Sequence, residues 1–249
     1  MIKVLDHGYV RLVSYTQPPV SAPISVRDFN DREIAQEVRR DARWTGDLEI
    51  VRAARTSFDA DWRTGEDAGK DIKLIERLWK DGHTSPFEAM SFSFEIQAPI
   101  FVFRQWHRHR TQSYSEVSAR YAELPEMFYL PELENIGVQS KLNKQGRKPE
   151  EENIFAKVFR DRLEEHSKTA FQEYRIALSN DIPRELARLF LPFNTYSRMY
   201  ATANLLNWFR FLTLRLHPHA QYEIRVYAEA ILHMIEDICP VAVQAYTNP

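Results

Sequence analysis

A long apolar stripe at helical spacing is the strongest constraint on the fold of this chain. Between Glu150 and Ala177 the apolar residues that recur with the period of a helix are Phe155, Phe159, Leu163, Ala170 and Tyr174. Such a stripe gives one apolar and one polar face, so it predicts a single long amphipathic helix. Further helices are predicted over residues 48–58, 71–80, 99–106, 204–216 and 219–238. The charged segment 28–43 is a candidate polar helix whose charges form a solvated face.

Other segments have the signals of strands, caps and loops. Residues 2–15 alternate around His7-Gly8 and predict a strand pair, and residues 90–97 alternate as in a half-buried strand. Asp181 and Pro183 predict the N-cap and first turn of a helix ending near residue 191. Residues 16–46 are an expected insertion, and the polar loop at about 135–150 is the expected mobile region. We expect one α+β domain over 1–249, with a small antiparallel or mixed sheet and long flanking helices.

Composition limits the classes of function. With 44% hydrophobic and 27% charged residues, the chain has the profile of a soluble globular protein with a full core. Lys and Arg number 33 against 35 Asp and Glu, so the broad basic field of a general nucleic-acid binder is missing. Seven glycines, without GxGxxG or a Walker motif, exclude a glycine-rich phosphate cradle. Any anion site has to be local.

The single cysteine and the N-terminus bear on location. Cys239 has no intrachain disulfide partner and precedes Pro240, so we expect it to pack rather than to act as a nucleophile. The first residues lack the apolar stretch of a signal peptide, and no run reaches the length of a membrane span. We expect a cytoplasmic protein that is not embedded in a membrane.

A local anion site is predicted between Arg104 and Arg120. This run contains four arginines and two histidines against one acid, Glu116. Arginine forks suit phosphate because two parallel donors meet two oxygens and the charge is permanent. The apolar segment 99–106 precedes the run and should anchor it at the end of a buried helix. Small hydroxyl donors add to the site, at Ser113, Ser115 and Ser118.

Arg188 and Arg215 are further candidates for the same ligand. Arg184 and Arg188 lie four residues apart on one helix face, and Asn204 and Arg215 should share a face of another helix. Arg188 and Arg215 have apolar sequence neighbours, where an unpaired charge is costly. The alternative to a ligand role is an ion pair with acids nearby in the sequence, Glu185 and Glu223.

Histidines occur as two alternate-residue pairs, His107 with His109 and His217 with His219, and His83 lies in a predicted turn. Such pairs can ligate zinc, but HExxH, CxxC and a nearby carboxylate pattern are all missing, so we expect no metal. The residues alone predict a pocket for a phosphorylated, aromatic small molecule. They do not specify the reaction.

The run from Arg108 to Arg120, RHRTQSYSEVSAR, resembles the signature RHRxxSxNxxSxR of the flavin-dependent thymidylate synthases. Every fixed letter is present except one, because Ser115 stands where the family has Asn and removes an amide from the flavin side. Further blocks follow in the family's order, among them RAAR at 52–55, SPFE at 85–88, PRE at 183–185 and HAQ at 219–221.

The resemblance implies an activity and an assembly. Members of this family reductively methylate dUMP to dTMP, with methylenetetrahydrofolate as the carbon donor, NADPH as the reductant and FAD as the hydride carrier. They are homotetramers whose sites combine residues of several subunits. Distant arginines of this chain would then share one pocket.

The resemblance also assigns residues by position. The dUMP set is Gln105, Trp106, His107, Arg108, Glu116, Val117, Ser118, Ala119, Arg120, Arg188 and Arg215. The FAD set is Ser85, Arg108, His109, Arg110, Glu116, Asn204, Leu206 and Arg210. Arg215 is the expected catalytic residue, because its charge beside the uracil imide would stabilise the deprotonated form. Arg120 with Ser118 would bind the phosphate. His83 is a candidate for orienting folate or relaying protons, or a turn histidine.

Two other classes of function compete with this interpretation. In the first, the basic run binds RNA or DNA phosphates while Tyr114 and Tyr121 stack on bases. In the second, the histidine pairs form the centre of a metal-dependent hydrolase. The balanced charge opposes the first and the missing ligand motifs oppose the second.

Overall fold

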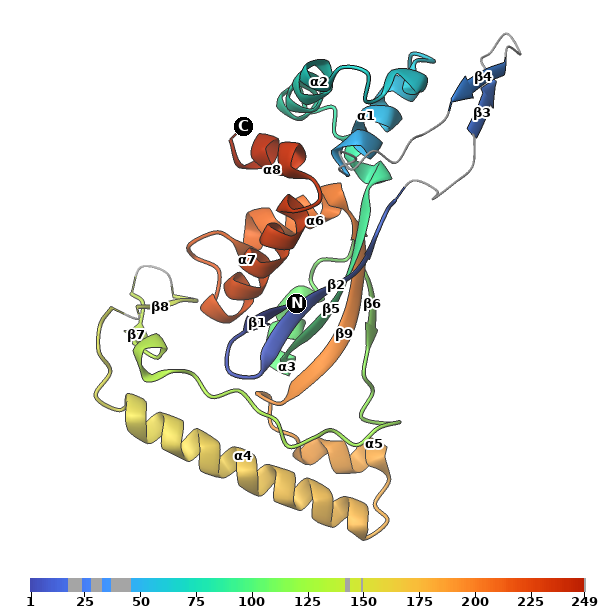
Figure 1. Cartoon of the computed structure of the whole chain (residues 1–249). Coiled ribbons are helices and arrows are strands. Elements are labelled where there is room, and N and C mark those ends of the chain that lie inside the picture. The colour runs from blue at the N-terminus through green and yellow to red at the C-terminus, as the bar shows by residue number, and fades with distance from the viewer. Residues whose placement is uncertain (18–23, 28–32, 37–45, 142–143, 149, 249) are drawn as a thin grey trace. The chain divides into compact units, whose positions relative to one another are not determined.

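The computed structural model describes residues 1–17, 24–27, 33–36, 46–141, 144–148 and 150–248 (Figure 1). Contacts divide the chain into two compact units. Unit 1 comprises Met1–Arg11, Phe94–Ala201 and Thr213–Ala230, and unit 2 comprises Leu12–Ser93, Thr202–Leu212 and Ile231–Pro249. Within the described ranges, no helix is both long and apolar enough to cross a membrane.

The main sheet has five strands in the order β1-β2-β5-β9-β6. Their bounds are β1 Ile2–Val4, β2 Gly8–Tyr15, β5 Ser91–Pro99, β9 Tyr196–Asn204 and β6 Ser113–Glu116. β1 and β2 pair antiparallel, with Ile2 opposite Val10 and Val4 opposite Gly8. The strand pair predicted within 2–15 and the strand predicted near 90–97 are therefore confirmed.

Gly8 is required by close packing at the β1–β2 turn. A Cβ on Gly8 would stand 2.0 Å from the Tyr227 hydroxyl oxygen and 2.6 Å from the Val4 carbonyl oxygen. The Tyr227 hydroxyl occupies this position because it donates to the carbonyl of Gln97 in β5 at 2.8 Å. A residue without a side chain is the one that fits beneath this hydrogen bond.

Strand β9 was missed from the sequence although it has the period of a strand. From Arg198 to Ala203, exposed and buried residues alternate. The buried positions include Ala201 and Ala203, whose small side chains have low strand propensity. Buried and exposed positions therefore alternate along β9, but alanines at two of the buried positions add little hydrophobicity for a sequence pattern to detect.

Unit 1 contains helices α3 (Ile100–Trp106), α4 (Ala156–Ser179) and α5 (Arg184–Ala187), a 3-10 turn (Arg188–Phe190) and the first part of α7 (Tyr222–Glu236). It also contains a short hairpin of β7 (Val138–Gln139) and β8 (Arg147–Lys148), preceded by a 3-10 turn (Leu133–Asn135). The predicted long helix is α4, which packs Phe171 and Tyr174 against Ala187 in a buried cluster.

Three predictions in unit 1 need correction. α4 begins at Ala156 rather than near Glu150. The N-cap of α5 is Pro183, and Asp181 lies before it with a positive φ of 59°, so Asp181 ends the preceding turn instead of capping the next helix. The expected polar loop at 135–150 contains the β7–β8 hairpin.

Unit 2 contains α1 (Asp47–Thr56), α2 (Ala68–Lys80), most of α6 (Leu205–Arg215), the end of α7, α8 (Pro240–Thr247), 3-10 turns (Asp61–Arg63 and Ser85–Ala89), and the hairpin of β3 (Ile24–Arg27) and β4 (Glu33–Gln36). The helices predicted near α1, α2, α6 and α7 are confirmed. The polar helix predicted over 28–43 is wrong at residues 33–36, which form β4, and its other residues lie outside the described ranges. α8 was missed because Pro240 suggested an end rather than a first turn.

The carboxylate of Asp47 links two helices of unit 2, α1 and α8. Asp47 is 3% exposed and accepts hydrogen bonds from the backbone N–H groups of Val241 at 3.0 Å and Ala242 at 2.9 Å. These are first-turn donors of α8, which have no partner inside the helix. The residue before α8, Cys239, makes no side-chain cap. Asp47 therefore supplies the cap from a distant helix, and its negative charge suits the helix N-terminus.

Asp47→Ala should lower the free energy of unfolding by about 1–3 kcal/mol, because it leaves one buried and one partly buried donor without this acceptor. The matched control is Asp67→Ala. Asp67 caps α2 through Lys70 N at 3.1 Å at an exposed position, and we expect a loss of about 1 kcal/mol or less. Urea denaturation of both variants measures the difference. Equal losses would contradict the interior cap.

Candidate functional site

The basic run from Arg104 to Arg120 is fastened to the end of buried helix α3. Trp106 is fully buried, and its indole N–H donates to Gln112 Oε1 at 3.0 Å. The Tyr114 hydroxyl donates to the His109 carbonyl at 2.7 Å. The loop after α3 is thus held against the helix end from two sides. This confirms the expected anchoring of the basic run on a buried element.

Arg215, the last residue of α6, makes two hydrogen bonds to this anchored segment. Its Nε donates to His109 Nε2 at 2.9 Å, and its Nη2 donates to the Gln105 carbonyl at 3.0 Å. An arginine only donates, so His109 Nε2 is unprotonated here. Burial, and then the Arg215 charge, lower the pKa of His109 to about 4. Arg215 thus binds α3 rather than Glu223, the partner considered from the sequence.

A cavity of about 560 Å³ brings together three distant parts of unit 1. The end of α3 contributes Arg104 and His107, the chain at and after β6 contributes residues 116–119, and the turn after α5 contributes Arg188. Apolar side chains form much of the remaining wall, including Phe103, Leu124, Leu191 and Phe193. Several of the residues assigned to dUMP therefore converge on one cavity.

Arg120 and Arg188 meet at Glu185, in a setting that differs from the sequence prediction. Arg120 Nη2 lies 3.4 Å from the Glu185 carboxylate, and Arg188 Nε donates to the Glu185 backbone carbonyl at 3.2 Å. All three residues are exposed, so the burial cost expected for Arg188 is wrong. An exposed ion pair contributes little free energy. Arg120 can therefore exchange Glu185 for an anionic ligand at small cost.

Four residues assigned to FAD belong to unit 2. Ser85 begins a 3-10 turn, and Leu206 is buried in α6. Asn204 is the last residue of β9, and its Oδ1 accepts the N–H of Asn207 at 2.9 Å. Asn204 therefore caps α6. The prediction that Asn204 is a helical residue sharing a face with Arg215 is wrong. Arg210 donates to Asn207 Oδ1 at 3.1 Å.

The remaining FAD residues lie in unit 1. The side chains of Arg108 and Arg110 are exposed on either side of half-buried His109. Glu116 ends β6, and Ser115 precedes it in the same strand. The departure from the family signature therefore falls on an exposed strand residue next to the wall of the large cavity.

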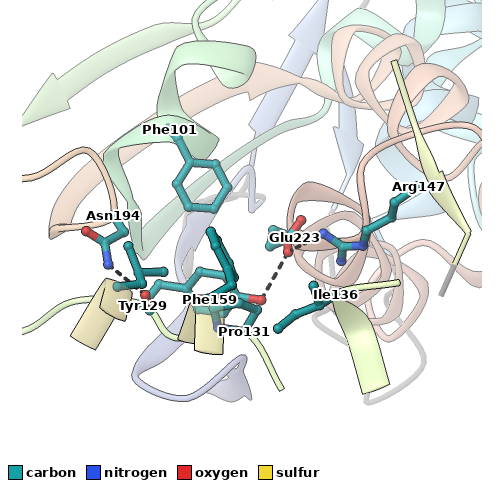
Figure 2. Close-up of a pocket in the computed structure, with 9 residues that line it drawn as sticks. Phe101, Tyr129, Pro131, Ile136, Arg147, Phe159, Asn194 and Glu223 are labelled. Atoms are coloured by element: carbon teal, nitrogen blue, oxygen red, sulfur yellow. Dashed lines mark hydrogen bonds and ion pairs between the residues drawn. The ribbon is translucent and has the colours of Figure 1, made fainter. Parts of the chain in front are cut away.

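A second cavity of about 320 Å³ surrounds the buried carboxylate of Glu223 (Figure 2). Glu223 Oε1 accepts from the Tyr129 hydroxyl at 3.0 Å and from Arg147 Nη1 at 2.9 Å. Its Oε2 accepts from Gln221 Nε2 at 2.9 Å. Burial and the Glu223 charge raise the pKa of the Tyr129 hydroxyl well above its usual range, so the hydroxyl remains a donor.

Arg147 and Tyr129 are partners of Glu223 that the sequence does not predict. They are 76 and 94 residues away from it in the chain. Local spacing carries no signal for such pairs. The one available hint was a glutamate next to the HAQ block, which was considered only as a partner of Arg215.

The two rival functions lose part of their support. Tyr114 is half-buried, and its hydroxyl donates to the backbone carbonyls of Trp106 and His109, so its ring is not presented for base stacking. Tyr121 is exposed. His217 Nδ1 accepts the N–H of His219 at 3.1 Å, and His83 is exposed in the turn after α2. Among the described residues, no three His, Cys, Asp or Glu side chains are grouped to hold a metal ion.

Comparisons with known proteins decide the family. Residues 41–241 match the family model described as "Thymidylate synthase complementing protein". The flavin-dependent thymidylate synthase of Treponema pallidum is 38% identical over 250 residues, which cover 98% of this chain and 70% of that protein. The one of Thermus thermophilus is 42% identical over 248 residues, covering 98% and 77%. The chain belongs to the flavin-dependent thymidylate synthase family.

A solved structure supports the same conclusion. The crystal structure of the UMP/dUMP methylase PolB from Streptomyces cacaoi, bound with 5-Br dUMP, aligns with a TM-score of 0.76 at 31% identity. The alignment covers 99% of this chain and 97% of that one. The resemblance drawn from Arg108 to Arg120 to the flavin-dependent thymidylate synthases is confirmed, and so is the α+β fold class.

The His109–Arg215 contact predicts a measurable titration. By NMR, the His109 ring should titrate near pH 4, and Arg215→Met should raise its pKa, because the nearby positive charge is removed. The pKa should stay below the ordinary 6.5, since burial is the larger cause. Arg175→Met, on the surface of α4, is the control and should leave the titration unchanged. An unmoved His109 pKa in Arg215→Met would rule out the contact.

The same shift has a consequence for stability. The folded-state pKa of His109 lies below its unfolded value, so as the pH falls the unfolded chain binds a proton at His109 before the folded chain does. The neutral His109 therefore contributes to the stability of the folded state. This contribution to stability is complete above about pH 6.5 and is lost as the pH falls toward 4.

Proposed function

We propose that this chain catalyses the reductive methylation of dUMP to dTMP, with methylenetetrahydrofolate as carbon donor, NADPH as reductant and FAD as cofactor. The observation that carries the proposal is the convergence of signature residues 116–119 with Arg188 on one cavity in a member of this family. Guanidinium and hydroxyl donors beside an apolar wall suit a nucleotide. The name of PolB, a UMP/dUMP methylase, supports a pyrimidine nucleotide.

In this proposal Arg120 and Ser118 bind the phosphate of dUMP. The Ser118 hydroxyl oxygen accepts the N–H of Arg120 at 3.3 Å, so its proton can be donated to a phosphate oxygen. Arg188 lines the same cavity as Ser118 and adds an exposed guanidinium there. The side chain of Trp106 is fully buried, so it would contribute to the site only through its backbone.

Arg215 would act on the uracil ring. Its bonds to His109 and Gln105 set the plane of the guanidinium. A fixed positive charge at the uracil imide would stabilise the deprotonated form and polarise the ring for attack. The low pKa of His109 keeps this histidine neutral at pH 7, so it orients Arg215 without adding a competing charge.

The residues assigned to FAD fit the chemistry of that cofactor. In unit 1, Arg108 and Arg110 are exposed guanidinium donors of the kind that a diphosphate requires. In unit 2, Ser85, Asn204 and Arg210 add hydroxyl, amide and guanidinium groups, and Leu206 is apolar. When bound, FAD would supply hydride transfer, and the protein would supply its binding and orientation.

We also infer a homotetramer in a reducing, cytoplasmic compartment. Large apolar side chains are exposed on α4 and after α5, including Phe155 at 66%, Phe193 at 60% and Leu189 at 78% exposure. Exposed apolar surface of this size supports burial against other subunits. The buried, unpaired thiol of Cys239 is consistent with a reducing environment.

The proposed function predicts a yellow protein whose flavin absorbance bleaches with NADPH and which converts dUMP to dTMP when methylenetetrahydrofolate is present. Arg215→Ala should lose most of the turnover while retaining flavin, because its charge acts on the ring. Arg175→Ala is the control for loss of an arginine. Colourless protein, or full turnover in Arg215→Ala, would contradict the proposal.

Arg120→Ala should weaken dUMP binding by about 1.5–3 kcal/mol, the range for a hydrogen bond to a charged group. Glu185→Gln makes the opposite change, since it removes the carboxylate that competes for Arg120, and should bind dUMP at least as tightly as the parent. Titration calorimetry compares the three proteins. Unaltered affinity in Arg120→Ala would remove Arg120 from the phosphate site.

A further inference from the structure

Hydrogen bonds link the buried carboxylate of Figure 2 to Gln105 at the end of α3. Gln105 Nε2 donates to Gln221 Oε1, and Gln221 Nε2 donates to Glu223 Oε2 at 2.9 Å. The backbone carbonyl of Gln105 accepts from Arg215 at 3.0 Å. The relay therefore runs from Glu223 to the residue that holds the proposed catalytic arginine.

Glu223 fixes the direction of every hydrogen bond in this relay. It is 2% exposed, and it already accepts from Tyr129 and Arg147 through its other oxygen. A carboxylate offers only acceptors, so Gln221 has to present its amide N–H to Glu223 and its carbonyl oxygen to Gln105. Gln105 must then donate to Gln221. Its carbonyl oxygen and its second N–H remain for a ligand.

The conformation of Gln221 supports a role for the relay. Gln221 is exposed and lies just before α7, so packing does not dictate where its amide points. The hydrogen bonds on both sides account for its orientation. Loss of either hydrogen bond would let the Gln221 amide rotate and exchange the positions of its oxygen and nitrogen. The Gln105 amide would then rotate as well, to keep its bond to Gln221.

We propose that Glu223 is a positioning residue that makes Gln105 select uracil over cytosine. The inference rests on the proposed function, because it takes Gln105 as a contact to the nucleobase. Uracil presents an N3–H donor beside a C4 carbonyl acceptor, whereas cytosine presents an N3 acceptor beside a C4 amino donor. An amide held in one orientation matches one ring and opposes the other, and turning it by half a rotation reverses the preference.

The experiment measures dUMP and dCMP affinity by calorimetry on the flavin-loaded protein. Glu223→Gln allows the terminal group to donate as well as accept, and Gln221→Met breaks the relay with a side chain of similar length. The ratio of dUMP to dCMP affinity should fall roughly 3- to 10-fold in both variants, the equivalent of one directional hydrogen bond. Tyr129→Phe keeps the carboxylate and should leave the ratio unchanged.

The outcomes separate this inference from the proposed function. If Glu223→Gln fails to fold, Gln221→Met decides, because Gln221 is exposed. An unchanged ratio in Gln221→Met, including an equal loss of affinity for both nucleotides, overturns the inference and leaves the proposed function standing when the parent protein binds flavin and dUMP. A parent protein that binds neither would overturn the proposed function itself.

Discussion

The hydrogen bonds from Arg215 to the end of α3 are the constraint on which the rest of the site depends. They join Arg215 to the segment that carries the family signature, and they use a histidine that burial keeps neutral. A positive charge beside a protonated histidine would be repelled. The low pKa of His109 thus lets a cation and an imidazole share a half-buried position, which sets where the guanidinium points.

Three arginines assigned to dUMP fall into two groups with different energetics. Arg215 is half-buried and bound to neutral acceptors, so its charge remains available in a region of reduced solvent screening. Arg120 and Arg188 are exposed, and the carboxylate of Glu185 is a weak partner of Arg120 alone. The first arrangement suits a fixed electrostatic role at a ring, and the second suits exchange of one anion for another.

The sequence predicted those features that are carried by local pattern. The apolar periodicity of residues 155–174 predicted α4, and the signature from Arg108 to Arg120 contains residues 116–119, which line the large cavity. Strand β9 escaped because alanines carry part of its alternation, and α8 escaped because Pro240 begins the helix instead of ending one. The partners of Glu223 were invisible for a different reason, since they come from segments far away in the chain that only folding brings together.

The Asp47 cap on α8 also bears on when unit 2 can fold during synthesis. The two N–H groups that donate to this carboxylate lie 194 and 195 residues later in the chain. Until residues 241 and 242 have left the ribosome, the buried carboxylate of Asp47 in α1 lacks these two donors. Unit 2 therefore cannot complete its packing around Asp47 before these residues emerge, and a chain cut before Val241 would leave the carboxylate without both donors.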